Sequence, residues 1–313
     1  MTVFLARRTI AAVLLLFAIT ALAFALIFSS GGNIARNILG ELATPEQIAG
    51  LTSELGLDRP IVVQYFAWLG GALRGDLGVS YFTATPVVDS IATRLPVTLS
   101  LVIVSIVIAA IIGVVLGVVA AVGRRWIDRV VQVFSVTAES LPNFWVGLAL
   151  VSVFAIGLSM FPATGYIPLQ ESFSGWVSTI TLPVIALVIG SIASSAQQVR
   201  SAVIDILRKD YVRTLRARGL AEPGILFRNV LRNAAPPAVT VISLQFIGML
   251  SGAVLIERVF ALPGLGSLAV NAATLGDIPV IMGVLVVTAI IVVIVNLIVD
   301  VAITWINPKA RVQ

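Results

Sequence analysis

The chain has 313 residues, of which 59% are hydrophobic and 11% are charged, and its mean hydropathy is +1.08. Soluble domains are about half apolar and about a quarter charged, so this composition predicts an integral membrane protein. Histidine and cysteine are both absent from the sequence, which excludes disulfides, the usual zinc sites and Ser-His or Cys-His catalytic pairs.

Neither of the two lysines, Lys209 and Lys309, follows a glycine, so the sequence contains no GxxxxGK[ST] phosphate loop. If the protein uses ATP, another chain must bind it. We therefore predict no catalytic residue, no metal and no cofactor on this chain. A membrane enzyme would have to work with Asp/Glu or Ser/Lys schemes alone.

Six segments are long and apolar enough to cross a bilayer, which takes roughly 20 helical residues. The first follows two arginines and contains small residues, as a cleaved signal peptide also does, but its apolar run exceeds the roughly 7–15 residues of that class. We expect a retained span and an all-α protein with six transmembrane helices. The predicted spans are 9–28, 97–122, 131–158, 177–199, 237–256 and 279–305.

The residues between the first two spans are too many for a simple connection, and they contain helix signals. Thr44, Pro45 and Gln47 match a capping box with proline at the first helical position, and Gly56 is a plausible stop. Segment 29–95 is therefore predicted to be a small helical cap on the outer side. It either lies on the outer leaflet or contacts a soluble partner.

Two further helices are predicted within this cap. One starts near Asp58 or Pro60, and another follows Pro86 and leads into the second span at Pro96. The apolar residues expected to be buried by the helix after Pro60 are Ile61, Tyr65, Phe66, Trp68 and Leu69.

Basic residues indicate the orientation, because cytoplasmic loops carry an excess of Lys and Arg. With the amino terminus inside, all but five of the 20 basic residues fall on inner segments. Both termini are thus predicted to be cytoplasmic. The orientation in the membrane explains the net charge of +5, so we expect no nucleic-acid partner. The five outer basic residues are Arg36, Arg59, Arg74, Arg94 and Arg258.

This topology divides the chain into four parts. They are a first transmembrane helix (1–28), the outer cap (29–95), a five-helix core (96–305) and a cytoplasmic tail (306–313). The core contains a charged cytoplasmic loop at 200–236. Six spans are few for a complete translocation path, so a second membrane subunit is expected.

The loop at 200–236 concentrates basic side chains between two apolar spans. Its pattern predicts two amphipathic helices separated by a break at Gly219, and Pro236 and Pro237 are expected to open the fifth span. The expected apolar stripes are Val203, Ile206, Leu207, Tyr211, Thr214 and Leu215 in the first helix, and Phe227, Val230, Leu231 and Ala234 in the second.

Two interpretations fit this loop. The helices can lie on the inner membrane surface with their arginines directed at anionic lipid. Alternatively, they form a compact knob that docks on a soluble partner through its arginines and passes a rigid-body movement into the spans. The pattern of residues leaves both interpretations open.

Polar residues within spans seldom face lipid, so they are candidates for a substrate path. Glu139 is the strongest candidate, because an unpaired carboxylate at that depth is costly and can meet a peptide amino group. For each candidate the alternative is a bond to a neighbouring helix or to a water. The candidates are Glu139, Asn143, Gln197, Gln198, Gln245 and Asn296.

The stretch YVRTLRARGL, followed by RNVLRNAAPP, resembles the EAA loop of ABC-importer permease subunits of the dipeptide/oligopeptide permease B type. Arg213, Thr214 and Leu215 hold the places of the residues that name the loop, and Gly219 holds its glycine. Segments 43–80, 252–268 and 295–311 are also similar to this family, so the resemblance covers nearly the whole chain.

The resemblance implies the type I ABC-importer permease fold in a prokaryotic cytoplasmic membrane. The implied partners are a homologous second permease, two ABC ATPases that bind Mg-ATP, and an external solute-binding protein. The implied cargo is a di- or oligopeptide, with nickel chelates, glutathione or haem as alternatives. The residues that would couple to an ATPase are Tyr211, Arg213, Thr214, Leu215, Arg216, Ala217, Arg218, Gly219, Leu220 and Glu222.

A secondary transporter or a channel is a more remote alternative. Such a protein would need coupling-ion sites or discontinuous spans in matched halves. The sequence shows no matched pair of that kind.

Overall fold

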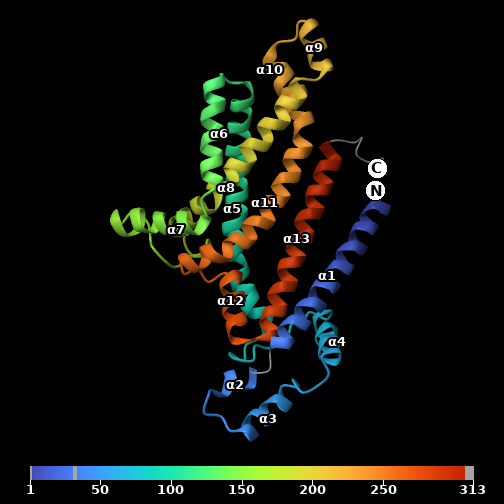
Figure 1. Ribbon diagram of the computed structural model, residues 1–313, viewed down its shortest axis with the longest axis vertical. Coiled ribbons are helices and arrows are strands. Elements are labelled where there is room, and N and C mark those ends of the chain that lie inside the picture. The colour runs from blue at the N-terminus through green and yellow to red at the C-terminus, as the bar shows by residue number, and fades with distance from the viewer. Residues whose placement is uncertain (1, 31–33, 307–313) are drawn as a thin grey trace. The chain divides into compact units, whose positions relative to one another are not determined.

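The computed structural model describes residues 2–30 and 34–306, and the regular elements within them are all helices. The chain divides into two compact units, and Figure 1 labels their helices. The first contains residues 1–96 and 263–293, and the second contains residues 97–262 and 294–313. Apart from Ile306, the last residue of α13, the predicted tail at 306–313 lies outside the described residues.

The first unit combines the predicted outer cap with two regions that the sequence did not associate with it. Its helices are α1 (Thr2–Ser30), α2 (Ile34–Leu39), α3 (Pro45–Glu54), α4 (Ile61–Ala72), α12 (Leu265–Leu275) and the first parts of α5 (Val87–Val122) and α13 (Ile278–Ile306). Helix α4 packs on α1 through Tyr65, which is stacked edge-on against Phe24 and lies 2.9 Å, oxygen to oxygen, from the hydroxyl of Thr20.

Local signals predicted the start and end of α3 correctly. The backbone N–H of Thr44 donates to Gln47 Oε1 at 2.9 Å, and the Gln47 N–H donates to Thr44 Oγ1 at 3.3 Å. Gly56, with φ of +67°, follows the end of the helix. The next helix was predicted less well, because Tyr65 is buried as expected but Phe66 on the neighbouring face is 55% exposed.

A buried carboxylate fixes the connection between α4 and α5. Asp277, the residue before α13, accepts a hydrogen bond of 2.5 Å from the Ser80 hydroxyl and one of 3.2 Å from the Tyr81 N–H. Ser80 Oγ in turn accepts the backbone N–H of Thr83 at 3.0 Å. Because these groups bond to one another, the irregular segment 73–86 has a defined position within the first unit.

The second unit is a helical bundle built around α8 (Phe173–Leu207). Its other helices are α6 (Arg125–Glu139), α7 (Asn143–Leu150), the π-helix η1 (Val151–Gly157), α9 (Asp210–Ala217), α10 (Glu222–Ile225), the π-helix η2 (Leu226–Val230), α11 (Leu231–Val259) and the remainders of α5 and α13. Helix α8 contacts α6, α7 and α11. The core of this bundle is formed by fully buried Leu101, Leu182, Leu187 and Ile256.

Five helices of the described residues are long and apolar enough to cross a membrane, and a sixth crossing exists if α6 and the α7–η1 segment count as one span. These two parts meet at an angle of 92° (Figure 1), so the predicted span 131–158 is not one straight helix. Pro142 explains the break, because it lacks an N–H donor and disfavours the helical conformation at Leu141.

Three spans are longer than predicted. Pro96 lies inside α5 and Pro236 and Pro237 lie inside α11, so these prolines do not open the spans. Residues 200–207, expected to begin a separate amphipathic helix, continue α8 instead. With 35 residues, α8 is roughly 52 Å long, whereas the hydrocarbon core of a bilayer is about 30 Å thick. One end of the helix must therefore project from the membrane.

Candidate functional site

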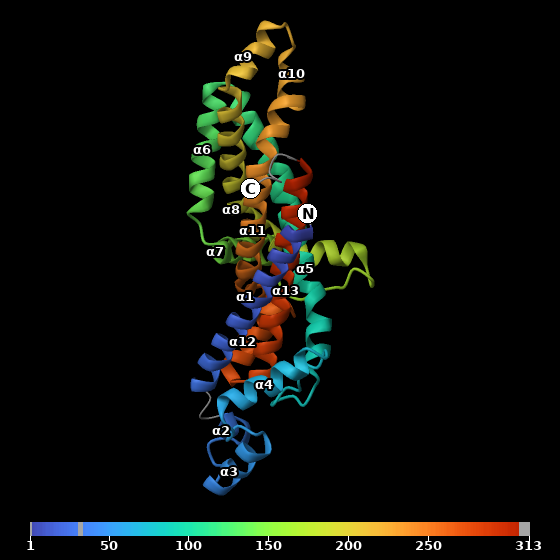
Figure 2. The ribbon, with the colours of Figure 1, turned by 90° about the vertical axis from the view of Figure 1, so that its right-hand side faces the viewer.

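The predicted docking loop is a compact knob formed by residues 208–230. Its helices α9 and α10 lie beyond the ends of α8 and α11, as both views show (Figures 1 and 2). The knob contains the predicted coupling residues from Tyr211 to Glu222. A short element held at the end of a helix longer than the membrane is accessible to a soluble partner.

Buried apolar side chains attach the knob to the helices behind it. Val212, Ile225 and Val230 are completely buried. They pack with Val203 of α8 and Ala234 of α11 in one cluster. Because protein interiors are close-packed and resist deformation, these contacts hold the knob firmly against α8 and α11.

The apolar stripes of the knob differ from those predicted. Val212 is buried in α9, whereas the predicted inward residues Tyr211 and Thr214 are exposed. In the second helix Val230 and Ala234 are buried as expected, but Phe227 is 69% exposed. The π-helical turns of η2 explain this difference, because their wider winding shifts which residues face inward.

Gly219 closes the first helix of the knob with two hydrogen bonds. Its N–H donates to Arg216 O at 2.9 Å, and the N–H of Leu220 donates to Leu215 O at 3.3 Å. This is the Schellman arrangement, in which the residue after the helix takes a left-handed conformation. The φ angle of Gly219 is +79°, and a β-carbon added there would have no neighbour within 4 Å. The predicted stop at Gly219 is confirmed.

An ion pair joins the two sides of this turn. The Nε and Nη2 atoms of Arg216 donate to the two carboxylate oxygens of Glu222 at 2.6 and 3.2 Å. The Glu222 carboxylate thereby raises the pKa of Arg216 above its ordinary value. These two predicted coupling residues therefore bond to each other. Arg213 has the more exposed side chain, at 75%, and its Nη1 lies 3.6 Å from the exposed Asp210 carboxylate.

The remaining predicted coupling residues lie on the surface of the knob, except one. Leu215 is half-buried and packs against the apolar cluster beneath the knob. The exposed members are Tyr211, Arg213, Thr214, Ala217, Arg218, Gly219 and Leu220. The knob thus presents arginines together with exposed apolar side chains.

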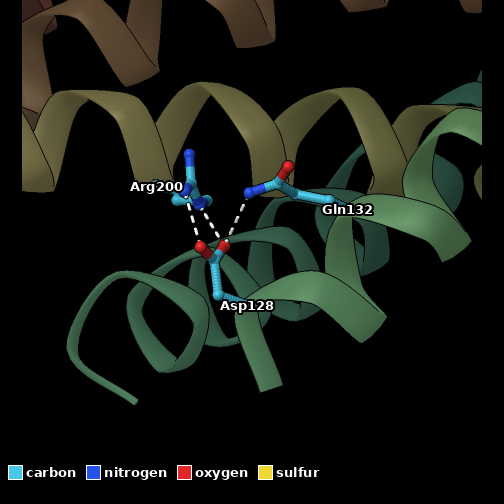
Figure 3. A network of polar contacts seen from close by, with 3 residues as sticks. All are labelled: Asp128, Gln132 and Arg200. Carbon is cyan, nitrogen blue, oxygen red and sulfur yellow. Dashed lines mark hydrogen bonds and ion pairs between the residues drawn. The ribbon is translucent and has the colours of Figure 1, made fainter. Parts of the chain in front are cut away.

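A second ionic contact joins two helices behind the knob. Asp128 of α6 receives both the Nε and the Nη2 donors of Arg200 of α8, the latter at 2.7 Å, and the Gln132 amide at 2.9 Å (Figure 3). Both charged side chains are about a quarter exposed. The sequence did not predict this pair, because its members are 72 residues apart. The sequence feature that could have indicated the pair is the spacing of Asp128 and Gln132, one helical turn apart, together with Arg200 directly after the predicted span 177–199.

We expect this pair to contribute about 1 kcal/mol of coupling free energy between α6 and α8, because a two-pronged Arg–carboxylate contact is stronger than an ordinary exposed ion pair. A double-mutant cycle of Asp128→Asn and Arg200→Gln measures it through the thermal stability of the chain in detergent. Replacing the exposed Arg129 by Gln is the matched control and should change little. Additive effects of the two substitutions would contradict the coupling.

Two of the predicted path residues bond to neighbouring helices. Gln245 of α11 accepts from the Ser195 hydroxyl at 2.9 Å and donates to Ser191 O at 3.1 Å. Asn296 of α13 accepts from the Ser243 hydroxyl at 2.5 Å. Their polar groups therefore have a structural role between helices.

The other path candidates have different surroundings. Glu139 is the last residue of α6 and is exposed at the break before α7. Gln197 and Gln198 are half-buried on α8. The Asn143 side chain lies near two glycines, within 3.5–3.7 Å of the points where β-carbons of Gly190 and Gly252 would be. Asn143 therefore lies where α7, α8 and α11 meet.

Comparison with known proteins identifies the family. Residues 113–312 match the family described as binding-protein-dependent transport system inner membrane component, and residues 1–102 match the amino-terminal region of such components. The MetNI methionine ABC transporter in an inward-facing conformation aligns with a TM-score of 0.53 and 20% identity, covering 69% of this chain and 96% of that chain. At this identity the likeness shows the fold.

Relatives of known name match almost end to end. A putative peptide transport system permease protein of Brucella abortus is 36% identical over 312 residues, which covers 99% of both chains. A probable peptide ABC transporter permease protein of Sinorhizobium fredii is 35% identical and covers 99% of this chain and 100% of that one. The glutathione transport system permease protein of Escherichia coli K12 is 35% identical over 306 residues, 97% of each chain.

These matches confirm the expected ABC-importer permease and the all-α membrane fold. The chain therefore belongs to the binding-protein-dependent transport system inner membrane component family and is a multi-pass permease subunit of an ABC importer.

Proposed function

We propose that this chain forms one half of a transmembrane path for di- or oligopeptides and that the knob at 208–230 docks on an ATPase subunit. The observation that carries the proposal is the construction of the knob. Its turn at Gly219 is held by the Schellman bonds and the Arg216–Glu222 pair, and its base is buried against α8 and α11. Such an element moves as one body with the helices to which it is attached.

Coupling then follows from the stability of two conformations of the transporter. Closure of the ATPases around Mg-ATP displaces the knob, and the attached helices move with it to favour the outward-open path. Hydrolysis removes that bias. The chain itself contributes no catalytic residue to ATP hydrolysis, because its sequence contains no GxxxxGK[ST] phosphate loop.

The remaining partners follow from the same function. A homologous permease completes the path, two ABC ATPases bind the knobs on the cytoplasmic side, and a solute-binding protein delivers the cargo from outside. Both termini are then cytoplasmic. Relatives named for peptide transport and for glutathione transport support a peptide cargo, with glutathione as the alternative of the same class. Nickel chelates and haem are further alternatives.

The absence of cysteine makes docking directly testable, because a single introduced cysteine is the only thiol of the chain. We expect Leu220→Cys, at a position 43% exposed on the knob, to form a cross-link to an ATPase subunit within the assembled transporter. A short thiol-to-amine reagent and mass spectrometry of the adduct provide the measurement. ATP should change the yield, since the knob moves during the cycle.

The control is Leu169→Cys, because Leu169 has a similar exposure of 47% but lies in the connection between η1 and α8. This variant should react with a soluble maleimide as readily as Leu220→Cys and should form no cross-link to the ATPase. Equal cross-linking from both positions, or none from the knob, would refute docking through this segment.

A further inference from the structure

A cleft in the first unit lies outside the knob and outside the proposed path. It has a volume of about 170 Å³ and is formed by the turn after α3, one face of α4, and residues of α1, the 73–86 segment and α13. Its walls are mainly apolar and aromatic. The residues that form them include Phe24, Val63, Ala67, Trp68, Tyr81 and Ile278.

A single positive charge lies at this cleft. Arg59 is the one charged residue among the described residues that line it, and within the described part of the chain its side chain forms no ion pair. Burial, and then the nearby Asp277 carboxylate, raise the pKa of Tyr81, so this phenol stays neutral at physiological pH. The cleft thus combines an apolar interior with one unpaired guanidinium.

Two further polar side chains line the cleft, Gln64 and Trp68, and they differ in their hydrogen bonds. The Gln64 amide donates to Arg59 O at 2.8 Å and to Leu57 O at 3.3 Å, so the protein already uses it. The indole N–H of Trp68 is buried and finds no acceptor among the described residues. Because this nitrogen is shielded from solvent, a ligand in the cleft contacts the ring of Trp68 and not its N–H.

The position of the cleft along α1 relates it to the bilayer. Phe24 lies near the end of the apolar stretch Ile10–Ile27, which is the candidate span of α1. The end of a span lies at the level of the lipid headgroups, where Trp and Tyr are enriched. Val62 and Phe66 are exposed on α4 outside the cleft, so this helix also presents apolar side chains suited to lipid.

We propose that the cleft binds a phospholipid with an anionic headgroup, such as phosphatidylglycerol, from the leaflet that surrounds this end of α1. Arg59 binds the phosphate, and part of one acyl chain fills the space between Val63, Ala67 and Trp68. The volume of the cleft suits part of a lipid and not a whole one. Pockets for drug-sized ligands measure roughly 300–1,000 Å³, whereas a segment of one acyl chain needs less space. The rest of the lipid stays in the bilayer. The lipid would brace α4 against α1 and α13.

The test uses the full-length chain purified in a mild detergent and washed free of lipid. Phosphatidylglycerol or phosphatidylcholine with the same acyl chains is added back, and the bound lipid is counted by native mass spectrometry. We expect phosphatidylglycerol to be retained preferentially and Arg59→Gln to reduce its retention roughly fivefold, as expected for one basic residue at an anionic lipid surface. Arg74→Gln, an exposed arginine outside the cleft, should have no such effect.

A second pair of variants tests the apolar part of the site. Ala67→Phe fills the cleft and should lower the retention of phosphatidylglycerol, whereas Val62→Phe adds similar bulk to the same helix outside the cleft and should not. Equal retention of both lipids, or equal loss in Arg59→Gln and Arg74→Gln, would overturn the proposal. Equal competition by oleate would also overturn it, because a free fatty acid would then be the ligand.

Discussion

Gly219→Val and Gly219→Asp should abolish ATP-driven uptake while the amount of protein in the membrane stays unchanged. The φ of +79° at this position disfavours a residue with a β-carbon by about 1–2 kcal/mol, and most strongly a β-branched one. A β-carbon has no neighbour within 4 Å, so the substitution does not disturb the core. The damage is limited to the turn that gives the knob its shape, and Asp adds a negative charge to a basic surface.

Uptake of a labelled di- or tripeptide into proteoliposomes containing the complete transporter measures this effect, and immunoblots measure the chain in the membrane. The matched control is Gly75, which has a φ of +87° and equally open surroundings but lies in the irregular segment 73–86, away from the knob in sequence. Gly75→Val should retain most of the uptake. Normal uptake by the Gly219 variants with intact ATPase assembly would refute the coupling role. An equal loss of uptake in the Gly75 variant would show that backbone strain at any such glycine, and not the knob in particular, causes the loss.

Gly117→Val should prevent stable folding of the second unit. A β-carbon at Gly117 of α5 would lie 2.7 Å from the carbonyl oxygen of Ala196 and 2.8 Å from Cβ of Val199, both on α8. Real contacts of this kind are longer, and the backbone of α8 cannot move aside. Overpacking of this kind costs about 1–3 kcal/mol or more, because the two helices must separate. A β-carbon at Gly113, four residues earlier, would lie even closer to Cβ of Ser195 on α8.

Size-exclusion profiles and thermal melting of the chain in detergent report this loss. Gly248→Val on α11 is the control, because Gly248 is also helical but a β-carbon there would have no neighbour within 4 Å. This control should melt within a few degrees of the wild type. If Gly117→Val melted in the same way, the close packing of α5 on α8 would not be required for folding.

Local chemistry was predictable from the sequence wherever one or two residues decide the conformation. The capping box of Thr44 and Gln47 and the helix stop at Gly219 depend on contacts within a few positions, and both are present. The composition and the apolar runs likewise predicted a multi-pass helical membrane protein. These features need no knowledge of which helices meet.

Features that depend on distant contacts were not predictable. The prediction that Phe227 faces inward was wrong, because the π-helical turns of η2 have more residues per turn than the regular α-helix on which the prediction was based. Prolines mark helix starts in soluble proteins, yet Pro96 and Pro236 lie within long helices, where packed neighbouring helices compensate for the lost donor. The Asp128–Arg200 pair and the packing of residues 263–293 with the cap connect positions far apart in the sequence.

The right-angle break between α6 and α7 leaves backbone polar groups that need hydrogen-bond partners. Helix α7 begins at Asn143 without a side-chain cap, so amide hydrogens at its start are left to other acceptors, and carbonyls at the end of α6 need donors. Hydrocarbon supplies neither, and a lipid-facing break would cost several kcal/mol for each unsatisfied group. If the α6–α7 pair crosses the bilayer, residues 140–143 must be wetted or covered by protein.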